Sequence, residues 1–223
     1  MSSILVCVPT LDSVSASFHA SQMQLRWNDG NRYGYSVKSN SLTYNARNEF
    51  ALDAVNGKYD YLVFVDSDIL MEPDTILRLV KDIQDSGADL VTGIYFKRRL
   101  PTSPVIYRKI DWYEDEVLGA QETAETYEDY PRDGGLFPVE GCGMGCCVIR
   151  VSVIPELVTA FRMAPFTPLP RLSEDLSFCW RMKVLGKKML CDPGILPGHV
   201  GMMVYRAQDW ERQRGKEGCS NDV

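Results

Sequence analysis

Positive charge is scarce in this sequence, and the scarcity excludes several kinds of partner. The 223 residues contain 24 Lys and Arg against 30 Asp and Glu, so the formal net charge is -6. A broad basic face for nucleic acid or anionic lipid is therefore not expected, although a local cationic groove could still exist. An anionic ligand would need a metal ion or focused Arg and Lys contacts.

The chain also lacks a long hydrophobic run. Its first apolar stretch, ILVCVP, is short, ends at Pro9 and follows no basic segment, which argues against a signal peptide or a membrane span. The seven cysteines are odd in number, and Cys142, Cys146 and Cys147 lack the Cys-x-x-Cys pairs of structural zinc sites. We therefore expect a cytoplasmic protein with reduced thiols.

Apolar runs and helical patterns alternate along the chain. The runs at 4–9 and 61–65 are continuous and rich in β-branched residues, which is typical of strands buried on both faces of a parallel sheet. Further strands are expected at 33–37, 88–96 and 188–192, a glycine-rich bend, a strand and a helix within 136–161, and helices at 13–27, 41–57 (capped by Ser41), 72–87 and 173–188 (capped by Ser173). This order predicts an α/β fold with a mainly parallel central sheet flanked by helices.

Two segments depart from the alternation. Between 111 and 133, nine acidic residues face one basic residue, Arg132, so we expect 111–135 to be an acidic flap or loop over the site. Residues 206–223 are polar and mixed in charge, and are expected to form a partly ordered C-terminal tail. The remainder, 1–205, is predicted to be a single domain because 223 residues leave little room for two.

Two aspartates stand one residue apart at the end of the strongest strand pattern. Asp66 and Asp68 flank Ser67, so in an extended strand end both carboxylates project to the same side. Ligands of parallel sheets bind beyond the carboxyl ends of the strands, which places Thr10 and Asp12 on the same rim. Like charges this close favour a bound cation, and a hard divalent ion is the natural occupant. The alternative is that the pair only caps the following helix, where carboxylates also suit the dipole.

Five stretches share an order with a known family. LVFVDSDI is preceded by YNARNEFALDAV and followed by LVTGIYFKR, EDLSFCWRMKVLGKK and PGILPGHVG. In order and spacing, over residues 1–200, this set resembles the glycosyltransferases of the GT-A fold, especially those similar to family 2. The resemblance implies the GT-A (nucleotide-diphospho-sugar transferase) fold and a hexosyltransferase-like enzyme. It would use Mn²⁺ or Mg²⁺ and move a sugar from a nucleoside-diphosphate sugar, most often a UDP-sugar, to an acceptor hydroxyl.

The resemblance also implies metal-binding and catalytic residues. In the family, the second aspartate of Asp-x-Asp holds the metal on the diphosphate and the first reaches the ribose or the metal's water shell; here these are Asp68 and Asp66. A late histidine often completes the coordination, and His199 stands in that position. The general base lies in a Glu-Asp pair at a helix start, matching Glu174 and Asp175, with Asp175 preferred. The reading of this pair as first-turn acids that only stabilise a helix stays open.

Other residues are expected to bind the donor. Pro9 and Thr10 match the family's nucleobase contact, and Arg47 matches an arginine that lines the nucleotide pocket. The glycine-rich bend at Gly143 is expected to let the backbone approach the sugar closely. With Lys97 and Arg99 chosen from the KRR triplet as phosphate contacts, the full set is Pro9, Thr10, Asp12, Arg47, Asp66, Ser67, Gly93, Lys97, Arg99 and Gly143.

The sequence departs from the family in ways that leave the substrates open. Typical members follow the second strand with an acidic turn that reads the base, usually uracil, whereas this chain has Ser39 and Asn40 there. It has no Gln-x-x-Arg-Trp motif, so a processive polysaccharide synthase is not expected. The acceptor cannot be read from the sequence: a glycan, a lipid-linked sugar, a protein, a small metabolite and a modified nucleic acid base all stay open.

Three alternatives stand beside the expected inverting transfer. A retaining glycosyltransferase shares the fold and the Asp-x-Asp. Sugar nucleotidyltransferases have a similar sheet, but they carry a Gly-rich, Arg-containing loop after the first strand, which VPTLDSVSAS lacks. From another class, a non-catalytic nucleotide-sugar binding module is disfavoured because Asp66, Asp68, Asp175 and His199 occur together in one chain.

Overall fold

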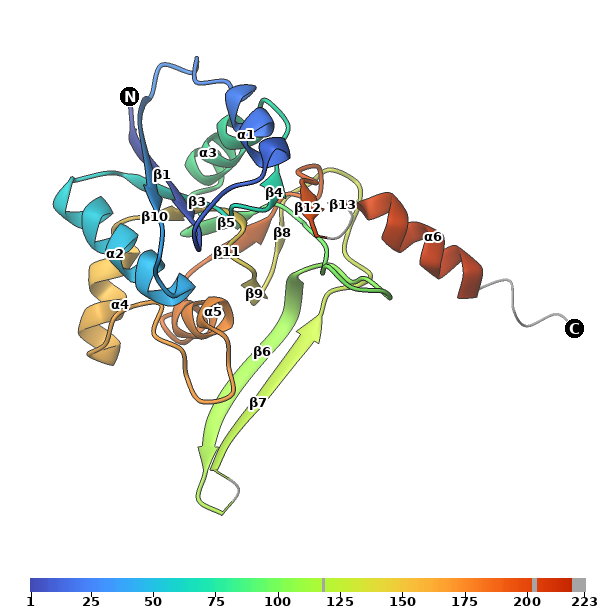
Figure 1. Ribbon diagram of the computed structural model, residues 1–223. Coiled ribbons are helices and arrows are strands. Elements are labelled where there is room, and N and C mark those ends of the chain that lie inside the picture. Colours follow the sequence, from blue (N-terminus) through green and yellow to red (C-terminus); the bar gives the residue numbers. More distant parts are fainter. Residues whose placement is uncertain (118, 202–203, 218–223) are drawn as a thin grey trace, which may run out of the picture.

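The centre of the protein is a seven-stranded sheet with helices on both faces (Figure 1). The computed structural model describes residues 1–117, 119–201 and 204–217. The strand order is β2-β1-β3-β10-β5-β11-β8, and only β10 and β8 run against their neighbours. The strands span Ser3–Pro9 (β1), Arg32–Lys38 (β2), Tyr61–Val65 (β3), Leu90–Thr92 (β5), Phe137–Pro138 (β8), Cys146–Arg150 (β10) and Met189–Cys191 (β11). The predicted mainly parallel α/β sheet is confirmed.

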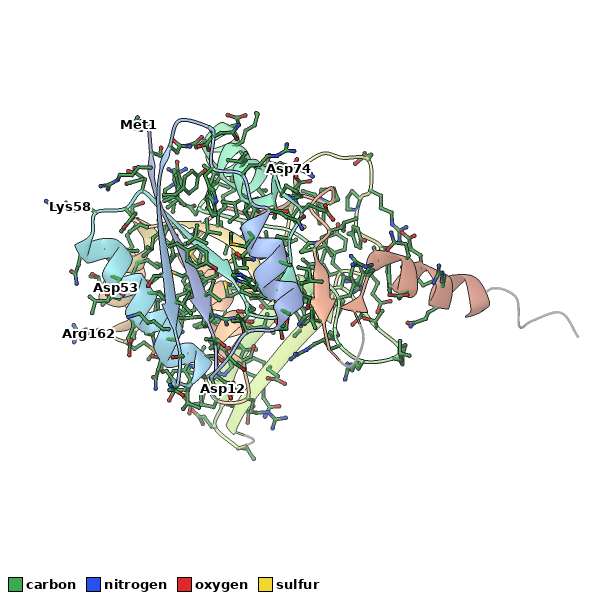
Figure 2. All side chains as sticks on the ribbon, turned by 45° about the horizontal axis from the view of Figure 1, so that its top comes forward. Met1, Asp12, Asp53, Lys58, Asp74 and Arg162 are labelled. Carbon is green, nitrogen blue, oxygen red and sulfur yellow. The ribbon has the colours of Figure 1, made fainter. Side chains whose placement is uncertain are left out.

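Successive side chains of the central strands point alternately into two separate hydrophobic cores, one on each face of the sheet. Leu5 and Cys7 of β1 belong to one buried cluster, and Ile4 and Val6 belong to the other. The first cluster is covered by α2 (Thr43–Asn56), α4 (Val153–Phe161) and α5 (Glu174–Val184), and the second by α1 (Ala16–Met23) and α3 (Thr75–Ser86). Burial on both faces explains why β1 and β3 are continuous apolar runs. In Figure 2, Asp12 lies at the opposite end of β1 from Met1, so that end of the strand forms the rim.

Serine side chains cap the starts of two helices. Ser15 accepts a hydrogen bond from the Phe18 amide at the start of α1, and the predicted cap Ser173 accepts one from the Leu176 amide at the start of α5. The predicted cap at Ser41 is wrong, because α2 begins after Leu42 and has no side-chain cap. Ser41 lies instead in the loop that precedes the helix, where its hydroxyl donates to the Leu42 carbonyl over 3.3 Å and caps no helix amide.

A small second sheet brings the chain's late segment to the rim. It has the order β13-β12-β4, from β4 (Ile69–Leu70), β12 (Gly198–Val200) and β13 (Val204–Tyr205). His199 pairs with Ile69, and the Val200 amide donates to the Asp68 carbonyl over 2.7 Å. Backbone pairing therefore fixes His199 beside the Asp-x-Asp turn.

The acidic segment is not a loop throughout. β6 (Ile106–Asp115) and β7 (Gly119–Thr126) form a long hairpin that projects from the body, and β6 also pairs with β9 (Gly141–Cys142) (Figure 1). Lys183 of α5 holds its base, donating to Asp111 over 2.7 Å and to Glu140 over 2.8 Å. Cross-strand hydrogen bonds stabilise a solvated ribbon that apolar periodicity could not reveal.

The segment expected to be a polar tail begins as a helix, α6 (Ala207–Glu217). Trp210 is only 3% exposed and anchors α6 against Phe96 and Tyr130, with ring centroids 5.6 Å away in each case. One large aromatic residue therefore docks an otherwise polar helix. No helix within the described residues is long and apolar enough to span a membrane.

Candidate active site

A polar pocket of about 330 Å³ opens at the carboxyl ends of β1 and β3, beside the start of α5. It is lined by Pro9, Thr10, Leu11, Ser41, Thr43, Arg47, Asp66, Ser67, Asp68, Arg98, Glu174 and Asp175. A larger cavity of about 650 Å³ lies between α2 and α4, but its lining is mostly apolar and includes none of these residues. The chemistry is therefore concentrated in the smaller pocket, at the position where open α/β sheets bind ligands.

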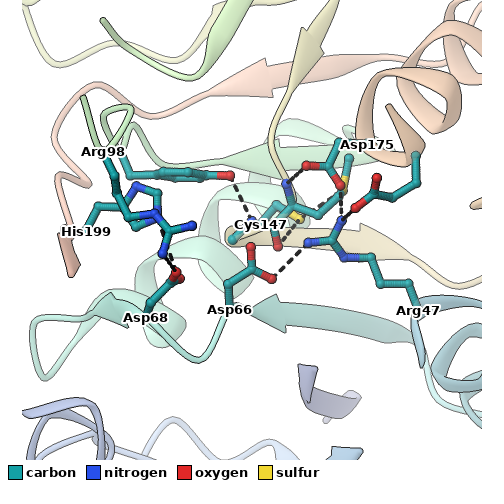
Figure 3. A network of polar contacts seen from close by, with 11 residues as sticks. Arg47, Asp66, Asp68, Arg98, Cys147, Asp175 and His199 are labelled. Carbon is teal, nitrogen blue, oxygen red and sulfur yellow. Dashed lines mark hydrogen bonds and ion pairs between the residues drawn. The ribbon is translucent and has the colours of Figure 1, made fainter. Parts of the chain in front are cut away.

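Arg47 binds three carboxylates in this pocket. Its guanidinium donates to Asp66 over 2.8 Å, to Glu174 over 3.0 Å, and to Asp175 (Figure 3). The residue is only 1% exposed, and its guanidinium lies over the Phe64 ring, 5.8 Å from the centroid. One cation thus joins the end of β3 to the first turn of α5. Three carboxylates against one guanidinium leave the cluster with an excess of negative charge.

Asp175 is poised to accept a proton near neutral pH. Burial raises the pKa of Asp175 to about 7; Arg47 opposes this rise, whereas Glu174 and Asp66 add to it. Its Oδ2 accepts a long hydrogen bond of 3.3 Å from the Met144 amide. The side chain keeps 21% of its surface exposed, so a substrate hydroxyl can reach it. These properties suit a general base.

Asp68 and His199 form a second polar group across the pocket from Arg47. Asp68 Oδ2 lies 2.6 Å from Arg98 Nη1 and 3.6 Å from His199 Nε2 (Figure 3). Burial acts to raise the pKa of Asp68, but the contacts with His199 and Arg98 outweigh it, so the pKa is lowered and the carboxylate stays charged. His199 Nδ1 lies 2.7 Å from the Phe96 carbonyl, which can only accept, so Nδ1 carries the proton. With Nδ1 donating to the Phe96 carbonyl, Nε2 is the ring nitrogen that faces Asp68 and that a cation could take as a ligand.

Only two of the three predicted metal ligands come together. Within the described residues, no group of three His, Cys, Asp or Glu side chains is arranged to hold a metal ion, and Asp66 turns one oxygen to Arg47. The 3.6 Å between Asp68 and His199 is nonetheless a separation that two ligands of one ion can span with bonds of about 2.1 Å. The pair fits a divalent ion that takes its other ligands from phosphate and water, as Mg²⁺ commonly does.

The glycine-rich bend serves packing beside the acids. The Gly145 amide donates to the Tyr95 hydroxyl over 3.2 Å, and the Gly145 carbonyl accepts from the Asp66 amide over 3.1 Å. A Cβ at Gly143 would come within 1.9 Å of the Tyr95 hydroxyl. Gly143 therefore makes room for Tyr95, rather than lining the pocket where the sugar was expected to lie.

Four more of the residues expected at the substrate lie outside the pocket lining. Asp12 is exposed and accepts from the Ser13 hydroxyl over 3.1 Å. Gly93 is buried against Ile195, whose Cγ2 would lie 2.5 Å from an added Cβ. Lys97 extends over the Tyr107 ring, with Nζ 5.8 Å from the centroid, and Arg99 is exposed. The remaining residues of the expected set line the pocket: Pro9, Thr10, Arg47, Asp66 and Ser67, with Asp68, Glu174 and Asp175.

The pocket also contains residues that the sequence interpretation did not select. Arg98 was the member of the KRR triplet left out, and only the loop's conformation shows that it is the one turned inward. Leu11, Ser41 and Thr43 complete the wall. The Asn40 amide donates to the Leu11 carbonyl over 2.6 Å and so ties this wall together. Nothing in the sequence marks Leu11, Ser41 or Thr43 as a pocket residue; Ser41 was expected only as a helix cap.

Comparison with known proteins identifies the family. The chain belongs to glycosyl transferase family 2, whose model matches residues 24–157, more than half of the chain. This range includes Arg47, Asp66 and Asp68 but ends before Asp175 and His199. The protein is thus a glycosyltransferase of the nucleotide-sugar type, with the GT-A fold expected from the sequence.

Solved structures agree on the fold. The crystal structure of A197 from STIV aligns with a TM-score of 0.58 at 20% sequence identity, covering 89% of this chain and 85% of that one. In all, 242 chains of solved structures match, so the shared architecture does not specify a substrate. A search of curated proteins found no match.

Proposed function

We propose that this protein is a metal-dependent, inverting glycosyltransferase that moves a sugar from a nucleoside-diphosphate sugar to an acceptor hydroxyl. One observation carries the proposal: Arg47 links Asp66 to Asp175 in a single pocket that also contains Asp68, with His199 beside it. A proton acceptor and a cation-binding pair thus face the same space.

The donor would lie along the wall from β1 to Asp68. Pro9 and Thr10 would meet the nucleobase, and the neutral hydroxyls of Ser41 and Thr43 line the same pocket, close after Ser39 and Asn40, which replace the acidic turn of family members. A UDP-sugar is the expected donor. Asp68 and the Nε2 of His199 would hold Mn²⁺ or Mg²⁺, which when bound would offset the charge of the diphosphate as it leaves.

Asp175 would act as the base. The acceptor oxygen forms a bond to the anomeric carbon while the bond from that carbon to the diphosphate oxygen breaks, leaving the electron pair on the diphosphate. The hydroxyl proton passes to Asp175, whose raised pKa suits this transfer at neutral pH. Arg47 keeps Asp175 oriented, and its buried position leaves little freedom for either side chain to move.

A thermal-shift panel tests the donor and the metal together. UDP-, GDP-, ADP- and TDP-sugars are added to the protein with and without Mn²⁺. One donor is expected to raise the Tm by about 5–10 °C at 100 times its Kd, only with the metal present, because a ligand that binds the native state stabilises it. Asp68→Asn should abolish the shift.

The matched control is Asp85→Asn, which removes an exposed aspartate that pairs with Lys81 on α3, away from the pocket. This variant should respond to the donor as the wild type does. A panel in which no nucleotide sugar raises the Tm in the presence of Mn²⁺ would contradict the proposed function.

A further inference from the structure

Arg98 already holds the carboxylate oxygen that the proposed function gives to a metal ion. Its Nη1 lies 2.6 Å from Asp68 Oδ2, the same atom that His199 Nε2 approaches to 3.6 Å. Figure 3 shows the guanidinium beside the imidazole, above Asp68. The positive charge next to this aspartate is therefore supplied by the chain itself.

A divalent ion and this guanidinium cannot share Asp68 without cost. An ion between Asp68 and His199 would bring a second positive group to an oxygen that already accepts from Arg98, and like charges at contact distance repel. Arg98 is the more easily displaced, since 51% of its side chain is exposed and such ion pairs are weak. It extends from the turn between Phe96 and Pro104, which is closed by a β-bridge and by hydrogen bonds between Lys97 and Ser103 and between Thr102 and Lys97, so the movement required is of the exposed side chain.

A displaced Arg98 would have one strong new partner. Arg47 and Arg98 are the basic side chains among the described residues that line the pocket, and both terminal nitrogens of Arg47 are bonded to Asp66, Glu174 and Asp175, while its Nε is buried. Once released from Asp68, Arg98 is thus the arginine of the pocket whose terminal nitrogens can bind a ligand. A guanidinium binds phosphate oxygens in a bidentate manner, and the diphosphate of the donor would lie within the same pocket.

We propose that Arg98 exchanges partners during the donor cycle. Without donor it neutralises Asp68; when a divalent cation binds Asp68 and His199, Arg98 moves to the diphosphate of the nucleotide. The inference rests on the proposed function and adds to it a residue that competes with the metal and then cooperates with the donor. It predicts that removal of Arg98 raises the affinity for the metal and lowers the affinity for the nucleotide.

The test measures both affinities separately in Arg98→Ala. Binding of Mn²⁺ alone, followed by electron paramagnetic resonance of free Mn²⁺, should become roughly two- to five-fold tighter because a competing cation is gone. Binding of UDP at saturating Mn²⁺, measured by calorimetry, should become roughly 10- to 100-fold weaker because a charged hydrogen-bond donor is lost. If UDP gives no heat with the wild type, GDP, ADP and TDP are titrated in turn.

Two further variants make the result specific. Arg108→Ala removes an arginine of similar exposure, 53%, that pairs with Glu125 over 3.1 Å on the hairpin, and should change neither affinity. Arg98→Lys keeps a charge without the planar fork and should give an intermediate nucleotide affinity.

The outcomes separate this inference from the function on which it rests. If the wild type binds a nucleoside diphosphate with Mn²⁺ but Arg98→Ala binds it equally well, the exchange is refuted and the proposed function stands. An unchanged or weaker Mn²⁺ affinity in Arg98→Ala also refutes the exchange. If the wild type binds no nucleoside diphosphate in the presence of Mn²⁺, the proposed function fails and the exchange fails with it.

Discussion

Asp175→Asn is expected to lower kcat by about 10²- to 10⁴-fold, the usual contribution of a general base, while the affinity for the donor changes only a few-fold. The amide keeps the shape of the side chain but cannot take the proton of the acceptor hydroxyl. Steady-state kinetics at saturating acceptor gives kcat, and calorimetry with the donor gives the affinity. Glu174→Gln, a neighbouring acid in the same first turn, is the comparison and should lose far less.

The pH dependence adds a second signature of Asp175. Because burial raises its pKa to about 7, the base is protonated and inactive below that pH, so kcat/KM should rise about tenfold per pH unit and level off above 7. The charge of Glu174 contributes to the raised pKa, so Glu174→Gln should move this limb to lower pH. A limb that stays in place in Glu174→Gln, or that persists unchanged in the residual activity of Asp175→Asn, would rule out Asp175 as its source.

Arg47→Met is expected to destabilise the fold by about 3–5 kcal/mol, because it leaves three clustered carboxylates without their buried cation. For a chain of this length the corresponding fall in Tm is roughly 6–20 °C. Circular dichroism during heating measures it. Arg181→Met is the matched control: Arg181 is also buried, but it donates to the neutral Pro165 and Thr167 carbonyls.

The two variants should differ in their pH dependence. Arg47 holds the pKa of Asp175 down against burial, so its removal raises that pKa further above the unfolded value of about 4. A raised pKa means that the folded state binds the proton more tightly, so stability is retained below about pH 4 and is lost as pH rises through the folded pKa. Asp175 is protonated at pH 5 in the folded form of both proteins, so the loss in Arg47→Met should grow mainly as pH rises above about 7. A loss as insensitive to pH as that of Arg181→Met would show that Arg47 acts by packing alone.

The sequence predicts those strands and helices whose burial produces a recognisable pattern of apolar residues. β1 and β3 are buried on both faces, so they appear as unbroken apolar runs, and α5 has a serine cap that the structure confirms. The hairpin of β6 and β7 is solvated and owes its stability to cross-strand pairs, so its acidic sequence resembled a loop. Trp210 could not be recognised as an anchor, because its partners Phe96 and Tyr130 lie far away in the sequence.

The candidate site also contains residues that the sequence predicts and residues that only the fold reveals. The Asp-x-Asp and the Glu-Asp pair are local patterns, and the family resemblance placed His199 near Asp68, which the backbone pairing of β12 with β4 brings about. The role of Arg47 as a shared partner of acids from two distant segments is a property of the assembled fold. Selecting Arg98 from the triplet, and assigning Gly143 to the packing of Tyr95, required the path of two loops.

The most direct test of the central claim, that Asp175 takes the proton of a hydroxyl attacking the donor in a single displacement, is the anomeric configuration of the product. Proton NMR of the transferred sugar, recorded as the reaction proceeds, gives that configuration relative to the donor. The account predicts inversion. Retention would mean that the reaction is not a single displacement in which Asp175 takes the proton, and would contradict the role given to Asp175.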